Sequence, residues 1–425
     1  MKISKYISSI PNNGILLTVN NLNYTKLDLL KKAVEFKKFS KIKSSDTVVL
    51  QRLGIVDFII SIIALDGFVN KIYFLPDNID LENIEYSVLL RNKLTPSRFS
   101  ENKDFIKSET EWILFTSGTT DKPKMISHTL TSLTQSCKSY DKDMASYKWI
   151  LTYDVNRFAG IQVILQALIS GNQLFIPDKF SFKSILSCIL SNEPNCISCT
   201  PSFFRKLLLN KDFQKMQFYQ ITLGGEIADT FLLNLITRKF PSSRLIHIYA
   251  STELGVGFSV KDKKSGFPRV WLEKPELAPL PMKVSSRSTL LLKPKVKPKG
   301  EEIDLRTNEN FLDTLDMVQV DDDRVFFTGR ENGVINIGGN KIHPEEIEEV
   351  IRNFPKTLEV KVYGKPSSII GEIIVAEIVM KSNTNNNIRD LKKFCLESLP
   401  KWKVPTSFKI VSNIKLSSTG KIYRV

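Results

Sequence analysis

An apolar run that opens directly into a loop of hydroxyl side chains constrains this chain more than any other stretch. Residues 112–115 (W-I-L-F) are long enough for a short buried strand. Hydroxyls, a glycine and a lysine follow in the sequence: Thr116, Ser117, Gly118, Thr119, Thr120 and Lys124. Backbone N–H groups and hydroxyls donate hydrogen bonds to phosphate oxygens, and the lysine supplies positive charge. The stretch therefore predicts a polyphosphate site at the end of a strand.

The loop is not a Walker A sequence. Pro123 stands where G-x-x-x-x-G-K-[ST] needs its second glycine, and Met125 stands where it needs Ser or Thr. Taken alone, the string S-G-T-T is more often a polar surface turn. The whole stretch favours a phosphate site, and a surface turn remains the alternative for the short string.

The composition is that of a globular protein with room for two or more domains, with 425 residues, 42% of them hydrophobic. Lys and Arg outnumber Asp and Glu by 60 to 45, so the net charge of +15 attracts anions. A nucleic-acid-binding protein is one interpretation of this charge, and coding bias towards lysine is another. Because zinc-finger spacing and RNP-like aromatic strings are missing from the sequence, no nucleic-acid partner is expected.

Cysteine usage and hydropathy indicate a cytoplasmic protein. Five scattered cysteines fit a reducing compartment better than a disulfide framework. The one C-x-x-C, from Cys196 to Cys199, has no second pair and is interpreted as a buried strand instead of a zinc site. The N-terminus lacks the apolar core of a secretory signal, and residues 53–65 are too short to span a bilayer. We therefore expect a soluble protein without a membrane span.

Strand and helix patterns alternate before the loop. Residues 46–50 and 71–75 are predicted strands on either side of an apolar helix at 55–65, which is the spacing of a parallel βαβ unit. A helix over residues 25–39 precedes them, and a further helix is expected over 130–140. The apolar face predicted for the first helix consists of Leu27, Leu30, Ala33 and Phe36.

Two later strands end in candidate ligand-binding residues. Residues 221–226 (I-T-L-G-G-E) end in two glycines, where a planar base can lie against bare backbone. Residues 245–249 alternate as a strand, and Ser251, Thr252 and Glu253 follow at its carboxyl end, where open α/β sheets bind ligands. Between residues 310 and 330 we predict a hairpin that turns at 321–323.

The pattern changes after Arg330, which predicts a domain boundary. Strands are expected at 334–337, 358–363 and 372–380, with one helix beginning at Pro344 and another around 388–399. These elements make up a small α+β unit.

The short motifs occur in one order over residues 115–424, and together they resemble the adenylate-forming superfamily. That superfamily comprises acyl- and aryl-CoA synthetases, luciferases and the adenylation domains of peptide synthetases. Before residue 115 the resemblance is weaker. It implies an α/β fold with a large, multi-subdomain N-terminal domain of mixed and parallel sheets, 1–331, and a small mobile α+β lid domain, 332–425.

The resemblance also implies an activity. An ATP-dependent ligase would join a carboxylic acid to AMP, release pyrophosphate and pass the acyl group to the thiol of coenzyme A. Two alternatives stay open: a ligase that loads the pantetheine of an acidic acyl carrier protein, and a catalytically reduced nucleotide- or acyl-binding relative. The second rests on departures from the usual pattern at Asp121, Arg157, Ala250, Leu315 and Asn332.

Site roles follow from the same resemblance. Lys421, Thr252 and Glu253 are expected to be catalytic, and Glu253 is also the expected Mg²⁺ ligand. Besides the phosphate loop, the residues expected to bind the nucleotide are Gly224, Gly225, Glu226, Tyr249, Asp316 and Arg330. The residues expected around the acid are Arg157, Phe158, Gly160, Ala250 and Gly255. Gly338 and Gly339 are expected in the thiol channel, and Asn332 is the expected hinge. Arg157 replaces the family's histidine, which predicts either a contact with an anionic group or a surface arginine.

Overall fold

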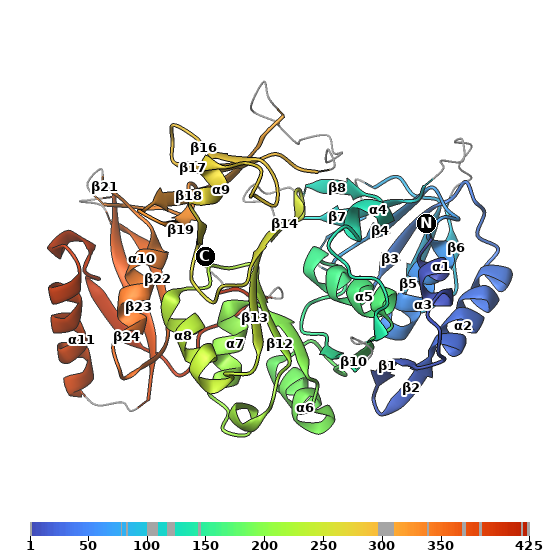
Figure 1. The fold of residues 1–425 in the computed structure, drawn as a ribbon, viewed down its shortest axis with the longest axis horizontal. Coiled ribbons are helices and arrows are strands. Elements are labelled where there is room, and N and C mark those ends of the chain that lie inside the picture. Colours follow the sequence, from blue (N-terminus) through green and yellow to red (C-terminus); the bar gives the residue numbers. More distant parts are fainter. Residues whose placement is uncertain are drawn as a thin grey trace.

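The N-terminal part of the chain contains a six-stranded sheet in the order β6-β5-β3-β4-β7-β8 (Figure 1). The computed structural model describes residues 2–77, 79–81, 84–99, 109–116, 124–142, 146–295, 310–337, 340–367, 371–381, 385–417 and 420–422. The strands are β3 (Thr47–Gln51), β4 (Lys71–Phe74), β5 (Val88–Arg91), β6 (Ser97–Arg98), β7 (Glu111–Phe115) and β8 (Met125–His128). Strands β3 and β4 are parallel and joined by the buried helix α3 (Ile55–Leu65), which confirms the predicted βαβ unit.

Two local predictions in this part are wrong. Helix α2 (Lys26–Phe39) buries Leu29 and not Leu27, which is 57% exposed, because its first turn is fixed by a capping box at Thr25 that points Leu27 to solvent. Helix α4 spans only Leu130–Leu133 and not 130–140. The following segment leaves the helix because Ser136 and Lys138 form hydrogen bonds with Gln162 and Gln166 of another helix.

A second sheet of eight strands has the order β14-β13-β12-β11-β9-β10-β1-β2. Its strands are β1 (Ile15–Val19), β2 (Leu22–Thr25), β9 (Lys148–Ile150), β10 (Gln173–Ile176), β11 (Cys196–Cys199), β12 (Gln220–Gly224), β13 (Arg244–Ser251) and β14 (Gly255–Val260). The inner strands are parallel, and β2 and β14 pair antiparallel at the edges. Cys196 and Cys199 are buried on β11, which confirms the interpretation of this motif as a strand.

Helices connect the strands of the second sheet. They are α5 (Phe158–Ser170), α6 (Phe182–Asn192), α7 (Pro201–Leu208) and α8 (Thr230–Lys239), and α1 (Ile3–Ser8) and the 3₁₀ turn η2 (Phe213–Lys215) are shorter. Pro201 occupies the first turn of α7, where its missing N–H costs nothing, and Thr200 caps that helix. Among the described residues, no helix has the length and hydropathy needed to cross a membrane.

A third sheet of five strands, in the order β15-β19-β18-β17-β16, adjoins the second. Its members are β15 (Phe267–Pro268), β16 (Met282–Val284), β17 (Thr289–Leu292), β18 (Leu312–Val320) and β19 (Arg324–Arg330), with α9 (Val270–Glu273) nearby. Strands β18 and β19 form the predicted hairpin.

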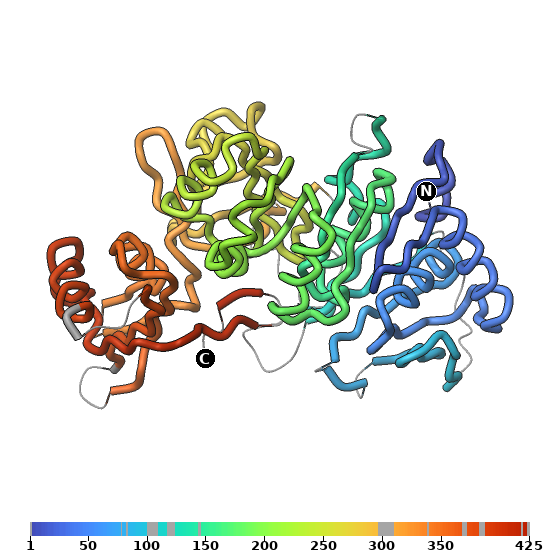
Figure 2. Tube along the Cα trace, turned by 90° about the horizontal axis from the view of Figure 1, so that it is seen from below, coloured from blue at the N-terminus to red at the C-terminus, as the bar shows by residue number. Residues whose placement is uncertain are grey.

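The C-terminal domain has its own sheet and core. The elements are β20 (Ile335–Ile337), β21 (Asn340–Ile342), α10 (Pro344–Arg352), β22 (Thr357–Ser367), β23 (Gly371–Met380), α11 (Asn385–Ser398), η3 (Lys401–Lys403) and β24 (Ser407–Ile410). Pro344 begins α10, as predicted. In Figure 2 the tail leaves this domain and returns towards the middle of the molecule. The architecture confirms the expected α/β fold with a small α+β domain, and the boundary at 331/332 stays a prediction.

Candidate active site

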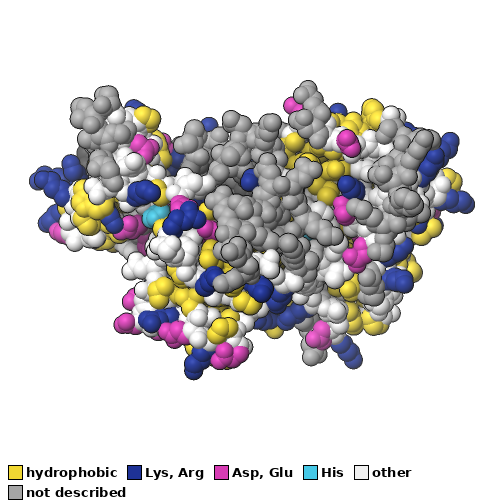
Figure 3. All heavy atoms as spheres, turned by 90° about the horizontal axis from the view of Figure 1, so that it is seen from above, with side chains coloured by type: hydrophobic (Ala, Val, Ile, Leu, Met, Phe, Trp, Pro, Cys, Tyr) yellow, Lys and Arg dark blue, Asp and Glu magenta, His cyan; other side chains and the backbone are white. Residues whose placement is uncertain are grey.

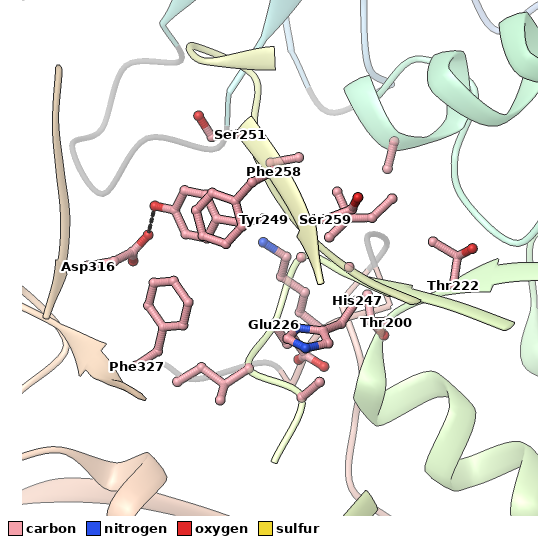
Figure 4. A pocket seen from close by; sticks show the side chains of 18 of the residues that line it. Thr200, Thr222, Glu226, His247, Tyr249, Ser251, Phe258, Ser259, Asp316 and Phe327 are labelled. Carbon is pink, nitrogen blue, oxygen red and sulfur yellow. Dashed lines mark hydrogen bonds between the residues drawn. The ribbon is translucent and has the colours of Figure 1, made fainter. Parts of the chain in front are cut away.

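A cavity of about 1720 Å³ lies between the carboxyl ends of β12 and β13, the β18–β19 hairpin and the C-terminal domain (Figure 4). It brings together most of the residues that the sequence singled out: Thr116, Lys124, Arg157, Phe158, Gly224, Gly225, Glu226, Tyr249, Ala250, Thr252, Glu253, Asp316, Arg330, Asn332 and Lys421. The predictions for Ser117, Gly118, Thr119, Thr120, Gly338 and Gly339 concern residues outside the described part of the chain. Asn332 lies in the exposed turn between β19 and β20.

Gly160 and Gly255 do not line this cavity. A Cβ on Gly160 would lie 2.1 Å from the backbone oxygen of Asp154, so this glycine allows α5 to approach the preceding loop closely. Gly255 begins β14 with a φ of +73° and opens onto a separate cavity of about 70 Å³. Both glycines have backbone roles that the motif alone did not indicate.

Tyr249 is held in a stack of aromatic rings. Its ring is stacked on Phe258 and on Phe327, at 5.1 Å between centroids in each case, with interplanar angles of 12° and 2°. Burial, together with the nearby Asp316 carboxylate, raises the pKa of Tyr249 well above its usual value, so its hydroxyl remains a donor. Tyr249 and Phe327 both line the cavity. Phe327 was not predicted from the sequence, because an irregularity in the β18–β19 pairing between Phe327 and Gly329 interrupts the alternation along β19.

Asp316 accepts hydrogen bonds from two protein donors. The Tyr249 hydroxyl donates to Oδ2, and Arg330 Nε donates to Oδ1 at 2.9 Å (Figure 4 shows the first bond). The preceding Leu315 has a φ of +59°, the left-handed conformation that the family's glycine at this position adopts freely. Leu315 therefore adopts the same backbone conformation that a glycine would adopt at this position. The Asp316 carboxylate lies at the cavity wall, where its remaining lone pairs can accept hydrogen bonds from hydroxyl groups.

Glu226 has different contacts from those expected. Its Oε2 accepts from the backbone N–H of Ser202 at 2.9 Å, and its Oε1 accepts from the backbone N–H of Ile422 at 3.0 Å. Both carboxylate oxygens of Glu226 therefore accept hydrogen bonds from backbone N–H groups. The neighbouring Gly225 has a φ of +80°, and a Cβ there would lie 3.2 Å from Cε of Lys421.

Lys421 lines the cavity beside Gly225. Burial lowers the pKa of Lys421, and the Glu226, Asp316 and Glu253 carboxylates act in the opposite direction. The Lys421 side chain is exposed within the open cavity, and carboxylates on three different elements lie near its ammonium.

Thr252 and Glu253 form the loop between β13 and β14. The carbonyl oxygen of Thr252 accepts a hydrogen bond from His128 Nε2 at 2.7 Å, and His128 Nδ1 lies 3.2 Å from Ser132 Oγ. Burial lowers the pKa of His128, which keeps the ring neutral. His128 ends β8, the strand that follows the phosphate loop, and the sequence analysis missed it.

Glu253 presents a carboxylate and Thr252 a hydroxyl at the wall of the cavity. Mg²⁺ prefers oxygen ligands and usually takes one or two carboxylates from the protein. Among the described residues there is no cluster of three or more His, Cys, Asp or Glu side chains that would enclose a metal. A single carboxylate on an open cavity wall agrees with an ion that completes its coordination with substrate and water.

Arg157 lies at the other end of the cavity and is not a surface arginine. Its Nη1 donates to the carbonyl oxygen of Phe115 at 3.4 Å, and its buried Nε has no partner among the described residues. Burial lowers the pKa of Arg157, and the Asp154 carboxylate opposes this, but an arginine remains charged. Polar side chains surround this end: Ser136, Gln162 and Gln166.

A buried ion network joins the C-terminal domain to the second sheet. Asp229, which caps α8, binds the guanidinium groups of Arg205 on α7 and Arg352 on α10. Burial acts to raise the pKa of Asp229, but the two arginines outweigh it and hold that pKa below its usual value. On the face shown in Figure 3, Lys and Arg side chains are dispersed among acidic and apolar ones.

Comparison with known proteins gives matches along most of the chain. A family model described as AMP-binding enzyme matches residues 78–278, and a model of the AMP-binding enzyme C-terminal domain matches residues 346–421. The 2-succinylbenzoate–CoA ligase of Listeria innocua serovar 6a is 24% identical over 373 residues, which cover 85% of this chain and 77% of the relative. The same enzyme of Staphylococcus aureus (strain MRSA252) is 26% identical over 347 residues, 76% and 68% of the two chains.

Solved structures share the fold. The o-succinylbenzoate CoA synthetase of Bacillus subtilis, in complex with its acyl-adenylate intermediate, has a TM-score of 0.72 at 18% identity and covers 99% of this chain and 96% of its own. An anthranilate CoA ligase in complex with anthranoyl-AMP has a TM-score of 0.78 at 15% identity, with coverage of 99% and 95%.

Proposed function

This chain belongs to the family of AMP-binding enzymes, and from that premise we propose that it activates a carboxylic acid with ATP and transfers the acyl group to coenzyme A. The observation that carries the proposal is the Lys421 ammonium, which lies in one cavity with Asp316, Glu253 and the base of the loop between Thr116 and Lys124. In that order, they supply a positive charge, an acceptor for ribose hydroxyls, a carboxylate for a metal ion and a loop for the polyphosphate.

Different residues have different roles in the first step, the formation of acyl-AMP. A carboxylate oxygen of the acid attacks the α-phosphorus, and the bond to the β-phosphate breaks, so pyrophosphate leaves. Asp316 and Arg330 hold the ribose, and Lys421 stabilises the negative charge that develops on the reacting oxygens. Glu253 and Thr252 would hold Mg²⁺, which neutralises phosphate charge when bound.

We propose a dicarboxylic aryl acid of the 2-succinylbenzoate kind as the substrate. The relatives named above act on that acid, and Arg157 supplies a charged guanidinium with an unengaged N–H at the far end of the cavity. Guanidinium groups bind carboxylates in a planar, paired geometry.

All five cysteines are free thiols, which supports a reducing cytoplasmic location.

Pyrophosphate exchange tests the proposal. The purified chain is incubated with MgATP, labelled pyrophosphate and one acid at a time: 2-succinylbenzoate, benzoate, malonate or a medium-chain fatty acid. We expect acid-dependent exchange, strongest with the dicarboxylic aryl acid. If no acid supports exchange while ATP still binds, the chain is a nucleotide-binding relative without the activity.

The acceptor is tested in a second assay. Labelled acid and MgATP are offered with coenzyme A or with a carrier protein that bears pantetheine. We expect the thioester of coenzyme A. Transfer to the carrier protein alone would overturn the proposed acceptor, and accumulation of acyl-AMP with both would show that the second step is absent.

A further inference from the structure

We propose that Thr200 and Glu226 are positioning residues that grip the backbone on both sides of Lys421 and so place its ammonium for adenylation. The inference rests on the proposed function, because it assigns a role within that reaction. We call the contacts of Thr200 and Glu226 with Gly420 and Ile422 the lysine clasp.

Thr200 holds the residue before the lysine. Its Oγ1 donates to the carbonyl oxygen of Gly420 at 2.5 Å and accepts from the backbone N–H of Phe203 at 3.1 Å. A hydroxyl has one proton and two lone pairs, so both bonds form together. Thr200 is 1% exposed, which shields this contact from water.

Glu226 holds the residue after the lysine. One carboxylate oxygen binds the N–H of Ile422, and the other binds the N–H of Ser202 in the first turn of α7. The N-terminus of a helix favours a negative charge, so the carboxylate is stabilised where it meets the tail. Figure 4 shows Thr200 and Glu226 on the side of the pocket away from Asp316.

Backbone hydrogen bonds also connect Ser417 to Gly420 and Lys421. The N–H of Ser417 donates to the carbonyl oxygen of Lys421 at 2.7 Å, and the N–H of Gly420 donates to that of Ser417 at 2.9 Å. Gly420 has a φ of +75°, and Leu416 pairs with Ile422. With its neighbours fixed on both sides, Lys421 extends past Gly225 into the cavity.

The clasp joins segments that are far apart in the sequence and belong to different domains. Thr200 and Gly420 are 220 residues apart, and Glu226 and Ile422 are 196 apart. Such a contact contributes little to the local folding of either segment beyond the cap of α7. A serine at position 200 would keep that cap and the clasp, whereas a valine would lose both.

The test compares Thr200→Val with Thr200→Ser in both half-reactions. Adenylation is measured by acid-dependent pyrophosphate exchange, and the second step is measured from synthetic acyl-AMP and coenzyme A. We expect the ratio of the first rate to the second to fall about tenfold in Thr200→Val, the equivalent of one hydrogen bond, and to stay near wild type in Thr200→Ser. Glu226→Gln should lower the ratio too, because its amide N–H₂ faces a backbone N–H.

Amine labelling provides a readout that does not depend on activity. The intact chain is treated with an acetylating reagent, and peptides that contain Lys421 are compared with those that contain Lys415, a second exposed lysine of the same tail. Because the clasp fixes the surroundings that shift the pKa of Lys421, we expect the labelling rate of Lys421 to change several-fold in Thr200→Val and not in Thr200→Ser, with Lys415 unchanged.

Three outcomes are decisive. If both half-reactions fall equally in Thr200→Val, or Lys421 is labelled at the wild-type rate, the clasp has only a structural role and the inference is wrong. A fall in the ratio together with a changed labelling rate supports it. If the wild type shows no exchange with any acid, the proposed function fails, and the labelling still decides whether the clasp holds Lys421.

Discussion

The two sides of the cavity are built differently. Tyr249 and Asp316 belong to strands of two sheets and are fixed by stacked rings and by paired donors. Lys421 lies on a tail whose backbone is held by the side chains of two residues, Thr200 and Glu226. The residues proposed to contact the nucleotide throughout the reaction therefore belong to the sheets, whereas Lys421, proposed to act at the reacting oxygens, is attached by a few hydrogen bonds.

Removing the lysine side chain should have the largest effect. Because its ammonium acts mainly in the transition state, we expect Lys421→Ala to lower acid-dependent pyrophosphate exchange about 10²- to 10³-fold with little change in the KM for ATP. Lys415→Ala, in the same tail and equally exposed but outside the cavity lining, is the matched control. Wild-type exchange in Lys421→Ala would remove this residue from the mechanism.

A substitution of Asp316 tests the side of the cavity that is built from strands. A ribose contact exists in the ground state and in the transition state, so Asp316→Ala should raise the KM for ATP, by about 10- to 100-fold for one charged hydrogen bond or more. Asp316→Asn keeps one acceptor and should lose less. If the wild type uses 2′-deoxy-ATP as well as ATP, the assignment to the ribose is wrong.

A substitution of Glu359 tests how the contact between the C-terminal domain and α7 affects stability. This residue on β22 is 4% exposed, and burial raises its pKa to about 7, although Lys206, Arg352 and Arg205 act to lower it. Between about pH 4.5 and 7 the unfolded chain loses this proton and the native state keeps it, so stability falls as the pH rises. Glu359→Gln should therefore stabilise the protein by about 1–2 kcal/mol more at pH 8 than at pH 5.

Urea unfolding at both pH values measures this difference, with Glu397→Gln on the exposed face of α11 as the control. The same change in the free energy of unfolding at pH 5 and pH 8 would show that Glu359 does not titrate in this range.

The smallest effect is expected at Arg157. This residue tests whether the end of the cavity proposed to bind the acid resembles the side built from strands or the side built from the tail. Since it is tied to the β7 carbonyl at Phe115, we expect it to act as part of the core. Arg157→Ala should lose about tenfold in kcat/KM for dicarboxylic acids relative to monocarboxylic acids, and Arg157→Lys should recover part of that loss. An identical acid profile in all three proteins would separate Arg157 from substrate selection.

The sequence predicted elements whose signal is local. Pro344 at the start of α10, the βαβ unit around α3 and the β18–β19 hairpin all follow from periodicity and turn chemistry. The motif order also located the residues that line the cavity, including Asp316 and Lys421.

Contacts between distant segments could not be predicted in this way. Thr200 and His128 look like ordinary polar residues at the end of a strand, and only the fold shows that they bind Gly420 and Thr252. Glu226 matched a nucleotide motif, but its partners are backbone groups 24 and 196 residues away. Such pairings depend on how the sheets pack, which periodicity does not encode.

The bond from His128 to the carbonyl of Thr252 couples two loops that are 124 residues apart. Strand β8 begins at Met125, directly after the phosphate loop, so a shift of that strand moves the imidazole, and the imidazole moves the backbone beside Glu253. His128 therefore connects the strand after the proposed phosphate loop to the loop that carries Glu253, the proposed Mg²⁺ ligand. Under the proposed function, binding at these two places is coupled, and we expect the order in which ATP and acid are taken up to depend on His128.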